Sequence, residues 1–397
     1  MTEARRGRSR WTILAVLFLA RTAMGFQFQS VASVSPFLIE TLAIDFAMLG
    51  TLIGLFKLPG AVLSLPSGTL GRRYSDRAIV ILGLALMALG GTLVGAAESY
   101  ATAFVGRLLS GIGAVLLNVY LTKMTLDWFD GREVVLAMAI LVNSWPFGIA
   151  IGLATQGALA VAFGWPAVLY LTALASLLGL VLIAVSYGSP PAVGTAGPAA
   201  GRLGALSRQE LVGISIAALS WSLFNVGLIL IVSFGPSHLT ARAFGVAEAG
   251  QLISIGTWLG VVTIPLGGFL AQRWNCPGPV ITVCLVAGAA ACWALASGPS
   301  PLLAILAFGV LAWAPAGPIM ALASEVIRPE NRAIGMGLFY TWYYGVMGVL
   351  PGFAGYLRDA SGDASAPILF AGVTMLAALV FALLTRPVRL AAVAKRS

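Results

Sequence analysis

The run GTLGRRY at residues 68–74 has a near copy, GFLAQRW, at residues 268–274. The two runs lie 200 residues apart, and a glycine, a leucine, an arginine and a final aromatic residue keep their positions in both. A second pair of runs, LAMA at 136–139 and IGMG at 334–337, repeats at nearly the same separation. The sequence therefore predicts two copies of one structural unit.

The composition indicates that these units lie in a membrane. Of the 397 residues, 59% are hydrophobic and only 9% are charged, whereas a soluble domain carries about 25% charged residues. About 20 mainly apolar residues are needed to cross a bilayer. Twelve windows meet this length, at residues 11–36, 46–70, 78–97, 101–126, 134–160, 165–186, 211–235, 249–272, 279–297, 300–323, 333–357 and 366–385.

A single break separates the first six windows from the last six. It contains the runs SPP and GTAGP, which are typical of a flexible linker. We therefore expect an all-α integral membrane protein with twelve transmembrane helices in two six-helix repeats. The expected divisions are a tail at 1–10, a bundle at 11–186, a linker at 187–209, a second bundle at 210–385 and a tail at 386–397.

Lysine and arginine residues are distributed unevenly between the predicted loops. Of 23 such residues, 18 fall in the tails, the linker and the loops on the same side, and two, Arg242 and Arg358, fall in loops on the other side. Cytoplasmic loops are enriched in these residues, so both termini are expected in the cytoplasm, at the plasma membrane (a bacterial inner membrane). The basic N-terminus precedes an apolar run of more than 20 residues, which we interpret as an uncleaved first span. The net charge of +9 is thus a signal of orientation, and no nucleic-acid partner is expected.

The remaining three basic residues, Arg21, Lys57 and Arg107, lie deep inside separate spans, and no Asp or Glu lies mid-span. An ionised side chain in hydrocarbon costs about 3 kcal/mol or more, so such residues usually face a cavity, a partner or a substrate pathway. Lysine also loses its proton when it is desolvated, which makes the charge of Lys57 less certain. Excess positive charge in the spans predicts a pathway for anions.

The loop after the second span, GTLGRRYSDR at 68–77, resembles the signature Gly-x-x-x-Asp-Arg-x-Gly-Arg-Arg of the major facilitator superfamily. In that family the aspartate helps to lock the two halves on the cytoplasmic side. Here Arg72 holds the aspartate position, and Asp76 is the carboxylate that could replace it. The resemblance extends over essentially the whole chain and implies a two-bundle transporter.

Two further motifs resemble this family. RLLSGIGA at 107–114 is similar to the Arg-x-x-Gln-Gly-x-Gly-Ala motif of the fourth span and departs from it at Ser110. Its two glycines permit close helix packing, and Asn118 lies on the same helix face as Arg107. NSWPFGIAIG at 143–152 resembles a degraded form of the fifth-span motif of proton-driven exporters. Pro146 predicts a kink with freed carbonyls.

The second half offers aromatic and amide side chains instead of charge. Their hydroxyl and indole groups could bind a polar solute, although core packing is the alternative for each residue. The candidate substrate-binding residues are Arg21, Lys57, Arg107, Asn118, Asn143, Trp145, Asn225, Trp258, Trp313, Tyr340 and Tyr344. The candidate gating residues are Gly68, Arg72, Arg73, Asp76, Arg77, Gly111, Gly113, Pro146, Gly268 and Arg273.

These observations predict a secondary active or facilitative transporter that moves a small anion, a carboxylate or an inorganic oxyanion, by alternating access. One alternative is a proton-coupled exporter of amphipathic compounds, which the aromatic residues favour and the missing mid-span carboxylate disfavours. Another is a membrane sensor or receptor on a transporter scaffold, although no soluble signalling domain is present. The chain has no nucleotide loop or nucleophile–base pair, and His238 is its only histidine. We therefore expect no enzyme, metal or cofactor, and a monomer suffices.

Overall fold

The computed structural model describes residues 3–64, 70, 73–129, 133–188 and 206–394. The regular elements in these ranges are helices. In the first half they are α1 (Glu3–Ser33), α2 (Ser35–Leu42), α3 (Phe46–Leu55), α4 (Pro59–Leu63), α6 (Asp76–Gly95), α7 (Tyr100–Trp128), α8 (Glu133–Phe163) and α9 (Trp165–Ser186). In the second half they are α10 (Arg208–Ala241), α11 (Val246–Arg273), α12 (Pro277–Ser297), α13 (Pro301–Leu311), α14 (Ala316–Val326), α15 (Arg332–Ser361) and α16 (Ala366–Ala394), with a short 3-10 helix at Pro329–Asn331.

Most of these helices are long and apolar enough to cross a membrane. Eleven segments of the described residues meet that condition, with α3 joined to α4 and α13 joined to α14 as one segment each. Helix α15 covers the expected eleventh span and provides the twelfth helix of the bundle. The predicted twelve-helix arrangement is thus confirmed.

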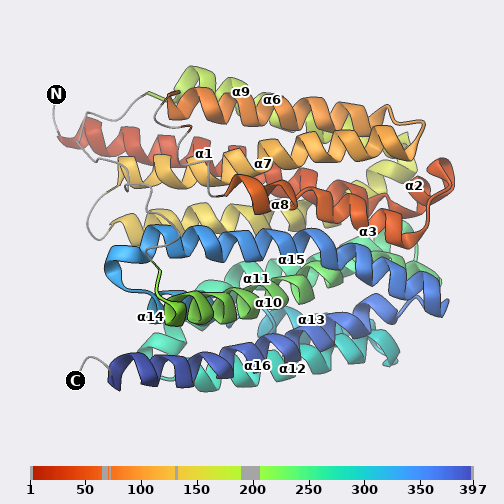
Figure 1. Ribbon diagram of the computed structural model, residues 1–397. Helices are drawn as coiled ribbons and strands as arrows, with labels where there is room; N and C mark the ends of the chain where they lie inside the picture. The colour runs from red at the N-terminus through yellow and green to blue at the C-terminus, as the bar shows by residue number, and fades with distance from the viewer. Residues whose placement is uncertain (1–2, 65–69, 71–72, 130–132, 189–205, 395–397) are drawn as a thin grey trace.

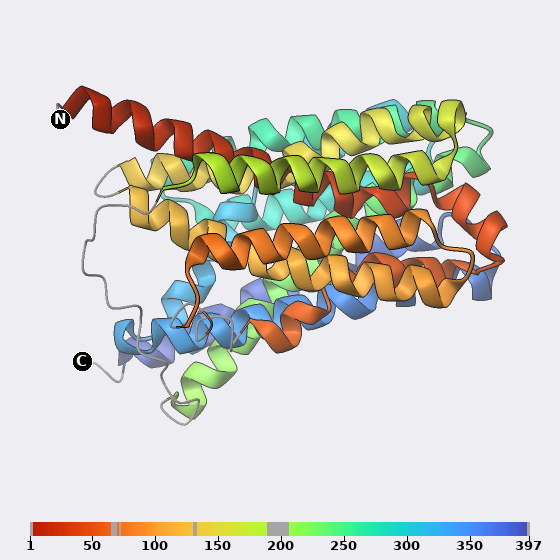
Figure 2. The same cartoon turned by 90° about the horizontal axis from the view of Figure 1, so that it is seen from above.

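The two repeats lie side by side. Figure 1 shows the helices up to α9 in the upper part of the molecule and those from α10 onward in the lower part, with both chain ends on the left. Figure 2, turned by 90°, again shows the long helices running in one general direction and both ends at the same side. We call that side the termini end and the opposite side the far end.

Each half is held together by its own helix contacts. Helix α1 packs on α8 and α9 while α6 packs on α7 and α9; in the second half α10 packs on α15 and α16 while α12 packs on α13 and α16. The halves are joined mainly by α3 and α4 with α15 and by α8 with α11, and to a smaller extent by α1 with α10. The space between these pairs is where residues of both halves can meet.

Glycine residues allow α3 and α15 to approach closely toward the far end. A Cβ atom added to Gly50 would collide with the carbonyl oxygen of Pro351, and one added to Gly54 would collide with that of Gly348. In the other pair, a Cβ on Gly250 would lie 2.6 Å from the carbonyl oxygen of Leu153. Small residues of this kind let helix backbones touch, so the far end is closed by backbone contact.

The far end also carries a helix cap that one half provides for the other. The first amide groups of a helix have no partner inside it, and carboxylates at this end are favourable. Asp359 of α15 accepts hydrogen bonds from the backbone N–H groups of Phe46 (3.1 Å) and Ala47 (2.7 Å) at the start of α3. The neighbouring Arg358 guanidinium lies 3.6 Å from the centre of the Phe46 ring. Opening this end must break these contacts.

The predicted gating residues at the termini end are only partly visible. Gly68, Arg72 and most of the linker 187–209 lie outside the described residues. Asp76 forms an ion pair with Lys123 of the same half, and Arg77 donates to the carbonyl of Ala184 in α9. Arg73 and Arg273 are exposed, and a Cβ on Gly268 would meet open space. Their gating roles, and the predicted division into two separable bundles, stay predictions.

Candidate substrate site between the two halves

Arg21 is buried near the middle of α1 and is held by neutral groups. Its side chain is 9% exposed. Nη1 donates to the carbonyl of Leu141 in α8 at 2.8 Å, and Nη2 donates to Oδ1 of Asn118 in α7 at 2.8 Å. The buried Nε has no hydrogen-bond partner. The guanidinium therefore has a spare donor, Nε, in the membrane interior.

Asn118 connects Arg21 to the second half of the protein. Its amide nitrogen donates to the hydroxyl oxygen of Tyr344 in α15 at 3.1 Å. The Tyr344 ring lies against Gly60 of α4, where a Cβ atom would collide with it. Arg21, Asn118 and Tyr344 thus form a hydrogen-bonded chain from α1 through α7 to α15.

Lys57 provides the second cation of the site. It lies in the short break between α3 and α4, just before Pro59, which lacks an N–H to continue the helix. Its Nζ is 3.6 Å from the centre of the Trp145 ring and 5.7 Å from that of Phe28. A cation over an aromatic face is stabilised by the negative face of the ring. Aromatic rings thus hold this ammonium group in place.

No carboxylate pairs with these cations among the described residues. The ion pairs there join Arg10 to Glu133, Lys123 to Asp76 and Asp127, and Arg328 to Glu210. None of them includes Arg21, Lys57 or Arg107. The positive charge in the centre of the molecule is therefore not neutralised by a neighbouring acid in the described ranges.

A small cavity lies between the cations and Tyr344. It has a volume of about 10 Å³, enough for roughly one water molecule. Its lining residues are Met24, Phe56, Lys57, Ala114, Val115, Asn118 and Tyr344. Arg21 is connected to this cavity by its hydrogen bond to Asn118. A larger groove of about 370 Å³ between α12, α14 and α16 contains Asn275, Thr282 and Glu325, but none of the three buried cations lines it.

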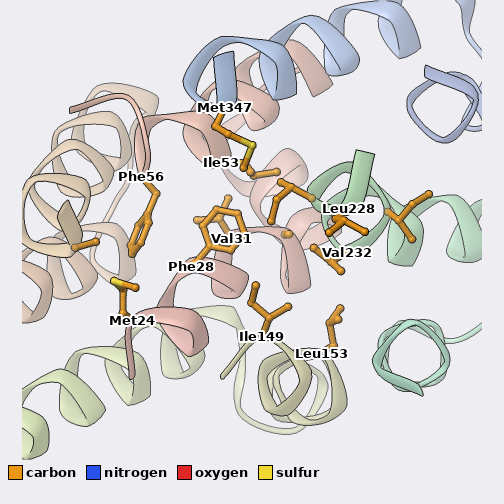
Figure 3. Close-up of a cluster of buried hydrophobic side chains, with 14 of the residues drawn as sticks. Met24, Phe28, Val31, Ile53, Phe56, Ile149, Leu153, Leu228, Val232 and Met347 are labelled. Atoms are coloured by element: carbon orange, nitrogen blue, oxygen red, sulfur yellow. The ribbon is translucent and has the colours of Figure 1, made fainter. Parts of the chain in front are cut away.

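An apolar cluster closes the cavity toward the far end. Figure 3 shows Val31 and Ile53 of the first half facing Leu228 and Val232 of the second, with Met347 above them. All five side chains are at most 3% exposed. Because this cluster excludes water and the glycine contacts lie beyond it, a solute from the far end reaches the cavity only after the halves move.

Arg107 was predicted to face the cavity, but it is not among the residues that line it. It is 1% exposed, and Nε donates to the carbonyl of Leu52 at 3.1 Å. Nη1 and Nη2 donate to the carbonyls of Gln27 (3.2 Å) and Phe28 (3.1 Å). The Phe56 ring lies 4.8 Å from its guanidinium carbon. All three donor nitrogens are used on backbone of α1 and α3, and Arg107 is not in the cavity lining, so here it braces the helices.

The glycines after Arg107 have the predicted packing role. A Cβ on Gly111 would lie 2.5 Å from the carbonyl oxygen of Leu55, and one on Gly113 would collide with that of Gly83. Pro146 lies inside α8, which continues to Phe163. Two residues later, a Cβ on Gly148 would collide with the carbonyl oxygen of Thr22 in α1. These residues let α7 and α8 pack closely on their neighbours.

The other candidates are spread along the interface. Asn143 donates to the carbonyl of Val261 in α11 at 3.0 Å, and Asn225 donates to Trp221 of its own helix at 2.8 Å. Trp258 is 37% exposed and packs edge-on against Phe147.

The remaining aromatic candidates belong to the second half. The Trp313 ring fills the space at Gly260, and its buried indole N–H has no partner. Tyr340 and Tyr344 pack together with Tyr343, at centroid distances between 5.0 and 6.2 Å. The structure therefore gathers Arg21, Lys57, Asn118, Trp145 and the tyrosines, and it places Arg107, Asn225 and Trp258 elsewhere.

Sequence reasoning missed two parts of the site. One is the Leu141 carbonyl, because a backbone acceptor leaves no signature in the sequence. The other is Phe28, whose ring faces Lys57; its spacing of seven residues places it on the helix face of Arg21, but it was not among the candidate residues.

Comparison with known proteins agrees with this architecture. Residues 17–351 and 211–396 match the Major Facilitator Superfamily. The chain belongs to this superfamily. Membership makes it a multi-pass membrane transporter and not an enzyme, as the sequence predicted.

Individual relatives in the superfamily are distant. The probable galactarate/D-glucarate transporter GudP of Bacillus subtilis (strain 168) is 22% identical, over 96% of this chain and 92% of its own length. The inner membrane transport protein YajR of Escherichia coli (strain K12) is 27% identical, but over only 34% of this chain and 30% of its own.

Solved superfamily structures share the fold. A bacterial homologue of the human lysosomal transporter Spinster, in an inward-facing and occupied conformation, superimposes with a TM-score of 0.75 at 17% identity over 97% of both chains. A D-xylose–proton symporter gives a TM-score of 0.72 at 14% identity, over 94% of this chain and 97% of its own. These likenesses concern the fold alone.

Proposed function

We propose that this transporter moves a small anion, a carboxylate or an inorganic oxyanion, by alternating access. The observation that carries the proposal is the pair of buried cations, Arg21 and Lys57, beside a cavity that both halves line. Burying charge in a membrane is costly, and functional pathways are where it is retained. An anion between these cations would provide the missing countercharge.

The positions of the two cations suit a solute that controls the movement of the halves. Arg21 and Lys57 belong to the first half, and Tyr344 in the cavity wall belongs to the second. A ligand changes a conformational equilibrium only through contacts that differ between the two states. An anion held by the cations and touching Tyr344 gains contacts when the halves close around it, which is the requirement for transport.

A named relative supports a more specific substrate class. GudP of Bacillus subtilis is described as a probable transporter of galactarate and D-glucarate, which are sugar acids with a carboxylate at each end. Two carboxylates match two buried cations in number, and a hydroxyl group of the solute can hydrogen-bond with the phenol of Tyr344. We therefore take galactarate as the first anion to test.

The test compares galactarate with galactitol, which has the same hydroxylated chain without the carboxylates. A ligand at 100 times its Kd stabilises the folded state by about 2.7 kcal/mol. We expect sodium galactarate to raise the melting temperature of the detergent-purified protein by several degrees and galactitol to leave it unchanged. Replacing Arg21 or Lys57 by glutamine should weaken this response at least tenfold, because a hydrogen bond to a charged group contributes about 1.5–3 kcal/mol.

Arg208→Gln, at the exposed start of α10, is the matched control and should respond as the wild type does. D-glucarate and sulfate complete the panel of anions, and lipophilic cations test the exporter alternative. Equal stabilisation by galactitol, or an anion response that survives Arg21→Gln, would overturn the anion proposal. Stabilisation by lipophilic cations alone would favour the exporter.

We also propose that both termini are cytoplasmic. Both chain ends lie at one end of the bundle (Figure 1), and the loops on that side carry most of the Lys and Arg residues. In a bacterial host, green fluorescent protein fused to the C-terminus should fluoresce, whereas alkaline phosphatase at the same position should be inactive. The reverse pattern would contradict this orientation.

A further inference from the structure

The Asn118 side chain separates the Arg21 guanidinium from the cavity. Its Oδ1 accepts from Arg21 Nη2 at 2.8 Å, and the residue itself lines the cavity beside Lys57 and Tyr344. The second acceptor of Arg21 is the Leu141 carbonyl on the side of α8. Arg21 is thus satisfied by two neutral oxygens, one of which belongs to a side chain that can rotate.

A buried guanidinium needs acceptors at every stage of a transport cycle. Leaving a buried charge without partners is costly, so an empty site requires oxygen atoms near the arginine. A carboxylate forms a stronger, charge-assisted hydrogen bond with a guanidinium than a neutral amide does. An arriving anion can therefore displace an amide oxygen from Arg21, while an empty site is kept stable by the same amide.

We propose that Asn118 is a positioning residue that substitutes for the transported anion when the site is empty. Its amide oxygen occupies the place at Arg21 Nη2 that an anion oxygen takes in the loaded protein. This inference rests on the proposed function, and it assigns Asn118 a role that differs from direct recognition. Asn118 sets the affinity by competing with the substrate for Arg21.

The bond from Asn118 to Tyr344 couples this exchange to the second half. In this structure the amide donates to the Tyr344 hydroxyl at 3.1 Å, while its oxygen accepts from Arg21. When the anion takes Arg21, the amide loses the contact that fixes its orientation toward α15. The contact between the halves at Tyr344 then differs between the empty and the loaded protein, which is what coupling between binding and movement requires.

Two substitutions of similar size test this inference in opposite directions. Asn118→Asp builds a carboxylate into the position at Arg21, and its oxygens can still accept from the Tyr344 hydroxyl. We expect the melting temperature of the ligand-free protein to rise and the apparent Kd for sodium galactarate to increase at least tenfold. Asn118→Leu removes the competing acceptor, so the ligand-free protein should melt earlier and galactarate should bind more tightly.

A double substitution separates this role from simple packing. In an Arg21→Gln background, Asn118→Asp would bury a carboxylate without its guanidinium partner, so the rise in melting temperature expected with Arg21 present should be lost. If Asn118 were only a packing residue, both single substitutions would lower stability and weaken galactarate binding together. That parallel loss would overturn the inference and leave the anion function standing. If galactarate, D-glucarate and sulfate all fail to stabilise the wild type, the anion function and this inference fall together.

Discussion

A protein carrying Arg107→Met is expected to unfold at a markedly lower temperature than the wild type. The guanidinium donates to carbonyls of Leu52, Gln27 and Phe28, and so ties α7 to α1 and α3. Leu52 lies in the last turn of α3, where carbonyls lack helical donors. Loss of three buried hydrogen bonds at about 1–3 kcal/mol each should lower the free energy of unfolding by roughly 3 kcal/mol or more.

The measurement is the fraction of protein that remains monodisperse after heating in detergent, followed by size-exclusion chromatography. Arg21→Gln serves as the comparison, because it should retain the fold and lose the galactarate response. Arg107→Lys should recover part of the lost stability, since an ammonium group reaches fewer of the three carbonyls. A stable Arg107→Met protein that no longer responds to galactarate would instead place Arg107 in the substrate site, as the sequence alone predicted.

A Gly50→Ala substitution should keep the far end from closing. The added Cβ would collide with the carbonyl oxygen of Pro351, which belongs to the opposite half and so is a neighbour only in the closed arrangement. Alanine favours a helix over glycine by about 1 kcal/mol, so the helix itself should not suffer. This collision should cost about 1–3 kcal/mol of overpacking in the closed arrangement only. The equilibrium between the closed and the open far end should therefore shift toward the open form by about 5- to 150-fold.

The readout is chemical labelling of a cysteine placed in the apolar cluster of Val31, Ile53, Leu228, Val232 and Met347. Val31 is fully buried in it, so Val31→Cys, in a protein without Cys276, Cys284 and Cys292, reports opening toward the far end. A membrane-impermeant maleimide should label this cysteine several times faster when Gly50→Ala is present. Gly345→Ala is the matched control, because its Cβ would lie 4.0 Å from the nearest atom. Equal labelling of all three proteins would show that the α3–α15 contact does not hold the far end closed.

Charge and hydropathy predicted the helices and the buried cations, because both depend on local composition. The break at Lys57 could be read from Pro59, and the break between α13 and α14 from Pro315. The hydrogen-bond partners of these side chains could not be predicted in the same way. Asn118 and Tyr344 are 226 residues apart in sequence, so only the packing of the two halves brings them together. The role of Arg107 likewise depends on backbone carbonyls of two other helices, which no pattern of side chains reveals.

The composition of α15 has a consequence for how the protein is made. This helix carries Tyr340 and Tyr344 together with the glycines that meet α3, so part of its surface is less apolar than a run of aliphatic side chains. Entry of a helix into lipid becomes less favourable as its hydrophobicity falls. It packs mainly on α3, α10 and α4, which the ribosome has already synthesised, and to a smaller extent on α16, which follows it. Translation order therefore delivers this helix at a stage when most of its neighbours are already in the membrane.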